Sequence, residues 1–222
     1  PILMSMASDP DFQNLTFNGN GLNGLGILEG TLSGVGRLER RDVAGITSIA
    51  YVSLSSVTIA SNGDLTIDPG VVIKMYAYYI SWNVEGIIRA SGTADPDSQI
   101  TWTSISDDSR GGDTNNNGNG TSPAISNWAN ITLNETSVDS ACQFEYCNFY
   151  YGNYAGSNSH GALTCINSGP TIDHCEFSFH YQGIGIWGNS NPVISNCTFL
   201  NMTYSPIIMD LLSNPSLSTG NS

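Results

Sequence analysis

Positively charged side chains are scarce in this sequence. Lysine and arginine together number 6 among 222 residues, against 19 aspartates and glutamates, so the formal net charge is −13. No lysine or arginine follows Arg110. Nucleic acids and anionic membranes are bound by basic surfaces, so this balance argues against both as partners. It is compatible with cation binding and with solubility outside the cell.

Helix formers and long apolar runs are also few. Lysine and glutamate are rare while glycine, asparagine, serine and threonine are plentiful, which favours short strands and many turns over helices. No apolar run approaches the roughly 20 residues that span a bilayer, so we expect no membrane insertion. No signal-peptide pattern opens the chain, and we expect the PILMSM start to belong to an excised or mature segment.

What the sequence does contain is a short repeat. Four stretches align: CQFEYCNF from Cys142, PTIDHCEF from Pro170, PVISNCTF from Pro192 and PSLSTGNS from Pro215, and PDFQNLTF from Pro10 belongs to the same set. The consecutive spacings after Cys142 are 28, 22 and 23 residues. A short period with apolar alternation, interrupted by asparagine, glycine and proline, predicts stacked coils joined by parallel strands.

The aligned stretches assign a role to each position of a coil. An inward apolar residue comes first (Phe144, Ile172, Ile194, Leu217), then an outward residue, and then a bend residue (Tyr146, His174, Asn196, Thr219). The bend residue breaks the alternation, so the strand turns a corner and keeps its apolar side chains inside. Asparagine suits such a corner because it tolerates left-handed backbone conformations.

The cysteines predict a buried ladder, not a metal site. Cys147, Cys175 and Cys197 occupy equivalent inward positions, and there is no Cys-x-x-Cys pair. Neighbouring parallel strands aim such side chains poorly for a disulfide. Cys142 and Cys165 remain candidates for a disulfide, although the total of five leaves at least one free thiol. Trp82, Trp102, Trp128 and Trp187 could form a sugar-stacking platform, but the same alternation favours core packing for Trp82 and Trp102.

This pattern resembles the right-handed parallel β-helix proteins, the broad pectate-lyase-like group. The stretches GDLTIDPGVVIK (63–74), VEGIIRASGTA (84–94) and ITWTSISDDSRGGDTNNNGNGTSP (100–123), followed by Trp128, are similar to a block common in secreted bacterial β-helix proteins. The resemblance covers most of residues 55–222. It implies an all-β fold, a right-handed parallel β-helix (solenoid) of roughly eight or nine coils that spans residues 1–222 as one domain.

The two ends of the chain resemble each other. Without a gap, five pairs are identical: Pro1/Pro206, Ile2/Ile207, Met4/Met209, Ser8/Ser213 and Pro10/Pro215. We therefore expect both ends to lie at the same phase of a coil, and the chain to be slightly more than one unit, of about 205 residues, of a longer tandem array. The alternative is that any two coils of a β-helix look alike.

Residues 107–122 form the most polar stretch, and we expect them to be a loop inserted between coils. Their alternating oxygen-bearing side chains suggest calcium, which takes six to eight oxygen ligands. The candidate ligands are Asp107, Asp108, Asp113, Asn115, Asn117 and Asn119. Counted from Asp113, the twelfth position is Ala124, where an EF-hand has glutamate, so the predicted affinity is weak. The alternative is a metal-free turn rich in asparagine and aspartate.

Glu145 and Asp173 provide the one candidate pair of catalytic carboxylates. They fall at the same outward position of neighbouring coils, so their Cα atoms should lie about 5 Å apart. Such a pair suits acid/base chemistry as in glycoside hydrolysis, or cation binding. A solvated acidic face is the commonest outcome for surface carboxylates, and we favour it.

Other catalytic patterns of β-helix enzymes are incomplete. Asp107-Asp108 and Ser159-His160-Gly161 resemble parts of the polygalacturonase set, but the arginine-x-lysine element is missing. Pectate lyases use an arginine or lysine near calcium, and the repeat half contains neither. A tyrosine base near His160 (Tyr150, Tyr151 or Tyr154) stays open.

We therefore expect a non-enzymatic structural or adhesive repeat of a secreted or cell-surface protein. It would stack end to end on itself or on neighbouring repeats, and so form extended or filamentous assemblies. The alternative is a carbohydrate-active β-helix enzyme, a polysaccharide lyase or hydrolase, or a polysaccharide-binding module.

Overall fold

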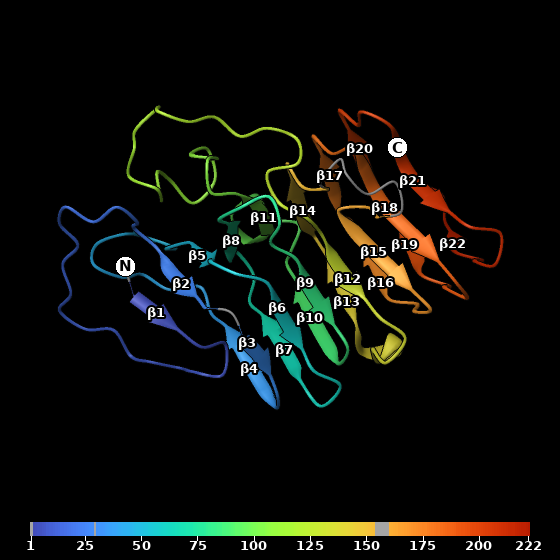
Figure 1. Cartoon of the computed structure of the whole chain (residues 1–222), viewed down its shortest axis with the longest axis horizontal. Coiled ribbons are helices and arrows are strands. Elements are labelled where there is room, and N and C mark those ends of the chain that lie inside the picture. Colours follow the sequence, from blue (N-terminus) through green and yellow to red (C-terminus); the bar gives the residue numbers. More distant parts are fainter. Residues whose placement is uncertain (1, 29, 154–159) are drawn as a thin grey trace.

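The computed structural model describes residues 2–28, 30–153 and 160–222, and its strands form three parallel sheets that run the length of the molecule (Figure 1). Sheet A contains eight strands, in spatial order β1 (Ile2–Met4), β2 (Leu25–Ile27), β5 (Tyr51–Ser53), β8 (Val72–Met75), β11 (Ile100–Ser104), β14 (Cys147–Tyr150), β17 (Glu176–Ser178) and β20 (Thr198–Leu200).

Sheets B and C contain seven strands each. Sheet B consists of β3 (Gly30–Leu32), β6 (Val57–Ile59), β9 (Trp82–Val84), β12 (Ile131–Leu133), β15 (Leu163–Ile166), β18 (Gln182–Trp187) and β21 (Ser205–Met209). Sheet C consists of β4 (Val35–Leu38), β7 (Asp64–Ile67), β10 (Ile87–Ser91), β13 (Gln143–Glu145), β16 (Thr171–Asp173), β19 (Val193–Ser195) and β22 (Ser216–Leu217). Two single-turn 3-10 helices, η1 (Pro96–Ser98) and η2 (Asp139–Ala141), lie in connections.

The chain visits the sheets in the order A, B, C, turn after turn. Because sheets B and C have seven strands each, β2 to β22 make seven complete turns, and β1 adds a strand of sheet A before them. Each strand pairs with the equivalent strand of the next turn, as the repeat predicts. Within the described residues, no helix is long and apolar enough to cross a membrane.

The predicted register of the repeat is confirmed. Phe144 pairs with Ile172, Ile172 with Ile194, and Ile194 with Leu217. The bend residues Tyr146, His174 and Asn196 have φ of 47°, 50° and 52°. These positive values turn the chain from sheet C into sheet A, because a left-handed residue breaks the strand without reversing it.

The last turn departs from this prediction. Thr219 does not adopt a positive φ, and the left-handed residue is Gly220, at φ 103°. Glycine has no Cβ to clash in that region, so the corner moves to it by one residue. The predicted bend at Thr219 is therefore wrong.

The prediction that both ends lie at the same phase is also wrong. Ile2–Met4 forms a strand of sheet A, whereas the matching residues Ile207 and Met209 lie in β21 of sheet B. Pro1 lies outside the described residues. The phase of a strand is set by its neighbour, and Leu25–Ile27 pairs with both β1 and β5 in sheet A. Short apolar strands fit more than one sheet, so sequence likeness alone did not fix the phase. The tandem array stays a prediction.

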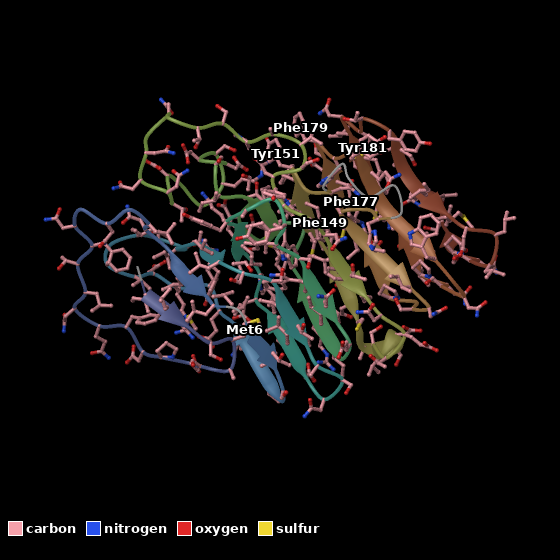
Figure 2. The ribbon with its side chains drawn as sticks, viewed as in Figure 1. Met6, Phe149, Tyr151, Phe177, Phe179 and Tyr181 are labelled. Carbon is pink, nitrogen blue, oxygen red and sulfur yellow. The ribbon has the colours of Figure 1, made fainter. Side chains whose placement is uncertain are left out.

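The core is a set of stacked side chains (Figure 2). Trp102, Phe149, Phe177 and Phe199 stack ring on ring, with centroids 5.0, 4.7 and 5.2 Å apart and planes within 11°. Trp82 meets Trp102 edge to face, and both are fully buried, which confirms their predicted place in the core. Repeating one ring type at one position gives each turn the same contact surface, and this holds the turns in register.

The cysteines behave as predicted for the ladder. Cys147, Cys175 and Cys197 are buried free thiols, and their Sγ atoms lie 3.2–3.6 Å from main-chain carbonyl oxygens. Cys142 and Cys165 are also buried and free, so the disulfide left open for them does not form in this structure.

Candidate functional site

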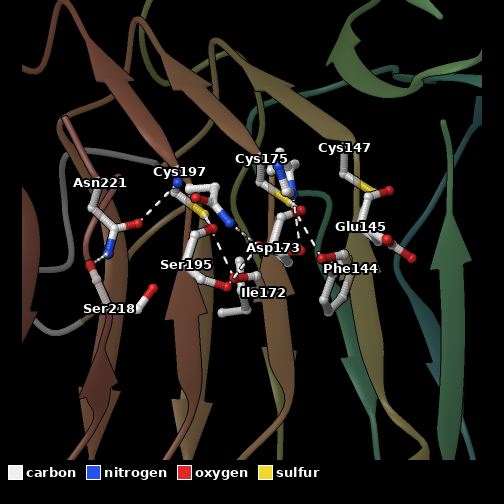
Figure 3. Close-up of polar contacts among 12 residues, drawn as sticks. Phe144, Glu145, Cys147, Ile172, Asp173, Cys175, Ser195, Cys197, Ser218 and Asn221 are labelled. Atoms are coloured by element: carbon white, nitrogen blue, oxygen red, sulfur yellow. Dashed lines mark hydrogen bonds and ion pairs between the residues drawn. The ribbon is translucent and has the colours of Figure 1, made fainter. Parts of the chain in front are cut away.

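The corner between sheets C and A brings the two candidate catalytic carboxylates together (Figure 3). Glu145 ends β13 and Asp173 ends β16, and the two residues pair in register, as predicted. Both are partly buried. The Glu145 carboxylate takes part in no hydrogen bond or ion pair with the described residues.

Asp173, by contrast, is bound by its neighbours. Its Oδ1 accepts hydrogen bonds from Ser195 Oγ at 2.6 Å and Asn196 Nδ2 at 2.9 Å, and its Oδ2 lies 2.9 Å from His174 Nδ1. Burial raises the pKa of Asp173, but the hydrogen bonds from Ser195, Asn196 and His174 outweigh it and leave the pKa below its usual value. A carboxylate held ionised by three donors is a poor proton donor. Its bonds to β19 and the following bend make it a clamp between two turns.

The predicted calcium ligands lie in one loop, and the carboxylates of two of them, Asp107 and Asp113, are engaged in hydrogen bonds. Asp107 is buried, and its carboxylate accepts from Thr103 Oγ1 at 2.6 Å and from the Ser109 hydroxyl at 2.5 Å. Asp113 accepts from the backbone N–H groups of Asn117 and Gly118 at 3.1 and 2.8 Å. These bonds are those of a self-closed turn rich in asparagine and aspartate.

Among the remaining predicted ligands, the Asn115 side-chain oxygen is buried and has no hydrogen-bond partner among the described residues. Asn115 and Asn117 both donate to Thr121 Oγ1, at 3.2 and 2.9 Å. Asn119 is exposed, and Asp108 is partly buried with its Oδ1 unpartnered. Among the described residues no three histidine, cysteine, aspartate or glutamate side chains gather as metal ligands do. Calcium binding stays a prediction.

A lysine supplies a cation beneath this loop. Lys74 projects from the outer face of β8, is fully buried, and its Nζ donates to the carbonyl oxygens of Asp107 and Gly112. Burial lowers the pKa of Lys74 to about 8, although Asp107, Asp108 and Asp113 oppose the shift. The lysine pins the start of the loop over sheet A. Sequence reasoning missed this role, because nothing in GVVIKMY distinguishes a buried lysine that hydrogen-bonds a loop from a solvated one.

The loop forms one wall of a groove over the outer face of sheet A. A hollow of about 650 Å³ lies between residues 109–112, residues 40–48 and the segment 96–99. Its floor consists of outward side chains of successive strands, Val72, Thr101 and Asn148. Sequence reasoning did not find this groove, because its walls are formed by connections between strands, and these connections do not follow the sequence repeat.

A second hollow of about 230 Å³ adjoins the first along the stack. The two share Gln99 and Asn148, whose side chains hydrogen-bond at 2.8 Å. Glu176 and Thr198 extend the line of outward residues beyond Asn148. The Tyr146 and His174 rings stack at the edge of this hollow, with centroids 4.6 Å apart. The groove therefore runs across several turns, a shape that suits an extended ligand.

The other catalytic candidates are poorly placed. Tyr150 is buried, and burial raises its pKa to about 12, so the phenol stays protonated at neutral pH and is not available as a general base. Burial also raises the pKa of Tyr151. Tyr154 and Ser159 lie outside the described residues. Trp128 is buried in the core, so it offers no sugar-stacking surface.

Comparison with known proteins supports the fold and does not extend to an activity. Residues 114–221 match the family model described as the right handed beta helix region. Together with the three parallel sheets, this match identifies the molecule as a right-handed parallel β-helix, as the repeat predicts. No curated protein and no solved structure matches the chain.

Proposed function

We propose that this chain is a non-enzymatic structural module, a solenoid segment of an adhesive protein outside the cell or on its surface. The observation that carries the proposal is the state of Asp173. The carboxylate best placed to form a catalytic pair with Glu145 is held by Ser195, Asn196 and His174 instead. Its hydrogen bonds to Ser195 and Asn196 join neighbouring turns.

The stacked side chains support the same function. Rings and thiols repeat at equivalent positions from one turn to the next. Such a stack transmits load through many equal contacts and resists bending between turns. These properties suit a spacer or stalk. An enzyme, by contrast, requires only one binding surface and one cluster of reactive side chains.

End-to-end assembly is part of the proposal. Exposed apolar side chains of the last turns include Met209, Leu212 and Leu217, and those of the first turns include Leu3 and Val35. Unpaired strand edges and apolar side chains favour pairing with a further turn. A second copy or a neighbouring repeat would supply that turn and extend the solenoid into a filament.

A depolymerisation screen tests the absence of catalysis. The wild-type chain, Glu145→Gln and Asp173→Asn are incubated with a panel of neutral and acidic polysaccharides, and new chain ends are quantified. Glu135→Gln is the matched control, since Glu135 is an exposed carboxylate outside this corner. We expect no new ends with any protein. Depolymerisation that disappears in Glu145→Gln and Asp173→Asn, but not in the control, would reject the structural function.

Sedimentation velocity over a range of concentrations tests the assembly. We expect the wild-type chain to form larger species as concentration rises, and Leu217→Asp to prevent them. The control is Val193→Asp, because Val193 is exposed on the flank of the solenoid and not on its end face. A wild-type chain that sediments as a monomer throughout would remove end-to-end stacking from the proposal.

A second candidate is a polysaccharide-binding module, and the groove over sheet A favours it. Its two hollows run across successive turns and offer amide, hydroxyl and aromatic side chains to an extended chain. Hydrogen-bonding polar side chains beside stacked rings are the usual means of holding sugars. Binding in this groove requires no catalysis and is compatible with an adhesive role.

A further inference from the structure

The six cationic side chains divide into three groups. Arg37, Arg41 and Arg89 pair with carboxylates (Asp68 and Glu39, Asp9 and Glu39, and Asp64, respectively). Lys74 is buried against main-chain oxygens. Arg40 and Arg110 complete the six, and neither forms an ion pair with a carboxylate of the described residues.

Both unpaired arginines line the larger hollow of the groove. Arg40 follows β4 and reaches it from residues 40–48, whereas Arg110 reaches it from the loop that Lys74 pins. Two arginines from segments far apart in sequence therefore line one hollow. In a chain with a net charge of −13, two arginines without a carboxylate partner in one hollow make that hollow suited to an external anion.

Neutral contacts hold both guanidinium groups in place. Arg40 donates to Ser48 Oγ and to the carbonyl oxygen of Asp97. The Arg110 guanidinium lies over the Tyr150 ring, 3.7 Å from its centroid, and donates to Ser109 Oγ. A guanidinium fixed by a ring or a carbonyl keeps donors for a carboxylate or sulfate and loses less freedom when it binds one.

We propose that this hollow binds a polyanionic polysaccharide, with one carboxylate or sulfate group on Arg40 and another on Arg110. The inference rests on the second candidate function, binding of a polysaccharide in the groove, and names the class of sugar. The polymer continues into the second hollow, where the Tyr146 and His174 rings and the Asn148 amide contact neutral parts of the chain.

Two carboxylates of the groove oppose the binding of an anionic group. Asp97 lies on the rim of the first hollow, and Glu176 lines the second. Glu176 also acts on the Tyr150 side chain, over which Arg110 lies, so its charge opposes an anionic group in both hollows. Removing its charge should therefore strengthen binding of a densely charged polymer.

The test is a binding measurement with immobilised polysaccharides at two salt concentrations. The probes are a polyuronate, a sulfated galactan, a neutral glucan and, as an acidic peptide, polyglutamate. We expect the wild-type chain to bind the polyuronate or the sulfated galactan, more weakly at high salt, and to bind the glucan and polyglutamate far less. Whichever of the two anionic polysaccharides binds identifies the source of the anion.

Variants connect that binding to the two arginines. Arg40→Gln with Arg110→Gln should weaken polyanion binding at least about tenfold, since each removes a charge-assisted hydrogen bond. Glu176→Gln should strengthen it. Arg37→Gln is the matched control, an exposed arginine that pairs with Asp68, and should change nothing. The circular dichroism melting curve of the double variant should match that of the wild type.

The outcomes distinguish the inference of polyanion binding from the more general polysaccharide-binding function. Polyanion binding that the double variant retains, or preference for polyglutamate over every polysaccharide, overturns the inference. Equal binding of the neutral glucan, unchanged in the double variant, overturns the inference and leaves the polysaccharide-binding function standing. Binding of no polysaccharide removes both.

Discussion

The first and second halves of the solenoid hold their turns together by different chemistry. Up to Arg110, arginines tie segments to each other, and Arg41 alone contacts Asp9, Glu39 and the Tyr51 hydroxyl. From residue 142 on there is no lysine or arginine, and the same task falls to stacked rings, buried thiols and the Asp173 clamp. Stacking of like side chains recurs at every turn, whereas an ion pair connects only the residues that form it.

The stacked half should depend most on its rings. Phe177 lies between Phe149 and Phe199 and is fully buried, so Phe177→Ala opens a cavity in the middle of the ladder. We expect it to lower the free energy of unfolding by about 3–5 kcal/mol, measured by urea denaturation. Phe179→Ala is the control, since Phe179 is 38% exposed, and should cost about 1 kcal/mol. Equal effects of the two substitutions would contradict the inference that the buried rings stabilise the second half.

A histidine in the same half should make its stability depend on pH. The His180 ring is fully buried: Nδ1 accepts from the Gly152 N–H at 2.9 Å, and Nε2 donates to the Phe149 carbonyl at 2.8 Å. Burial lowers the pKa of His180 from 6.5 to about 4. The unfolded chain therefore binds the proton first as pH falls. Stability present above pH 6.5 should decline between pH 6.5 and 4, by about 3 kcal/mol in total.

Thermal unfolding across that pH range measures the effect. His180→Gln should be less stable at pH 7 but lose less stability on acidification. The slope that remains belongs in part to His160, whose pKa burial also lowers. His174→Gln is the comparison: His174 is exposed and contacts Asp173, so its substitution should cost some stability without removing the decline. An unchanged pH profile in His180→Gln would show that this ring does not titrate as inferred.

The two halves also differ in how far sequence predicts structure. In the second half, likeness between Phe144, Ile172 and Ile194 revealed the register, because equal side chains stack on each other. The Asp173 position followed from the same alignment, but its bonds to Ser195 and Asn196 did not, since they depend on side-chain direction. The bend at Thr219 failed because a neighbouring glycine was available for the corner.

The first half and the groove were beyond this reasoning. Ile2–Met4 resembles a strand of sheet B and yet lies in sheet A, because its partner Leu25–Ile27 decides its place. The hydrogen bond from Lys74 to the loop, and the placement of Arg40 and Arg110 around one hollow, depend on where three unrelated connections lie. No period in the sequence indicates which connections lie side by side, so only the folded structure shows it.

The ion-paired half should respond to salt where the stacked half does not. Arg41 is largely buried and donates to the Pro10 carbonyl at 2.8 Å besides its contacts with Asp9 and Glu39. Arg41→Gln should lower stability by about 1 kcal/mol at low salt and less at high salt, measured by urea denaturation. Phe177→Ala should show the same loss at both. A salt-independent loss for Arg41→Gln would mean that packing of its stem, not its charge, holds the first turns.

The smallest response is expected from the thiols. All five cysteines are buried and free, and desolvation raises the pKa of Cys165 to about 12 and that of Cys175 well above its usual value. Because the thiolate is the reactive form, a thiol reagent should label none of them in the folded chain and all five after denaturation. Labelling of Cys197 alone under native conditions would show that the last turns open while the inner ladder stays closed. Fast labelling of Cys147 or Cys175 would contradict a ladder in which thiols serve as small apolar groups, and with it the view that like side chains hold the second half together.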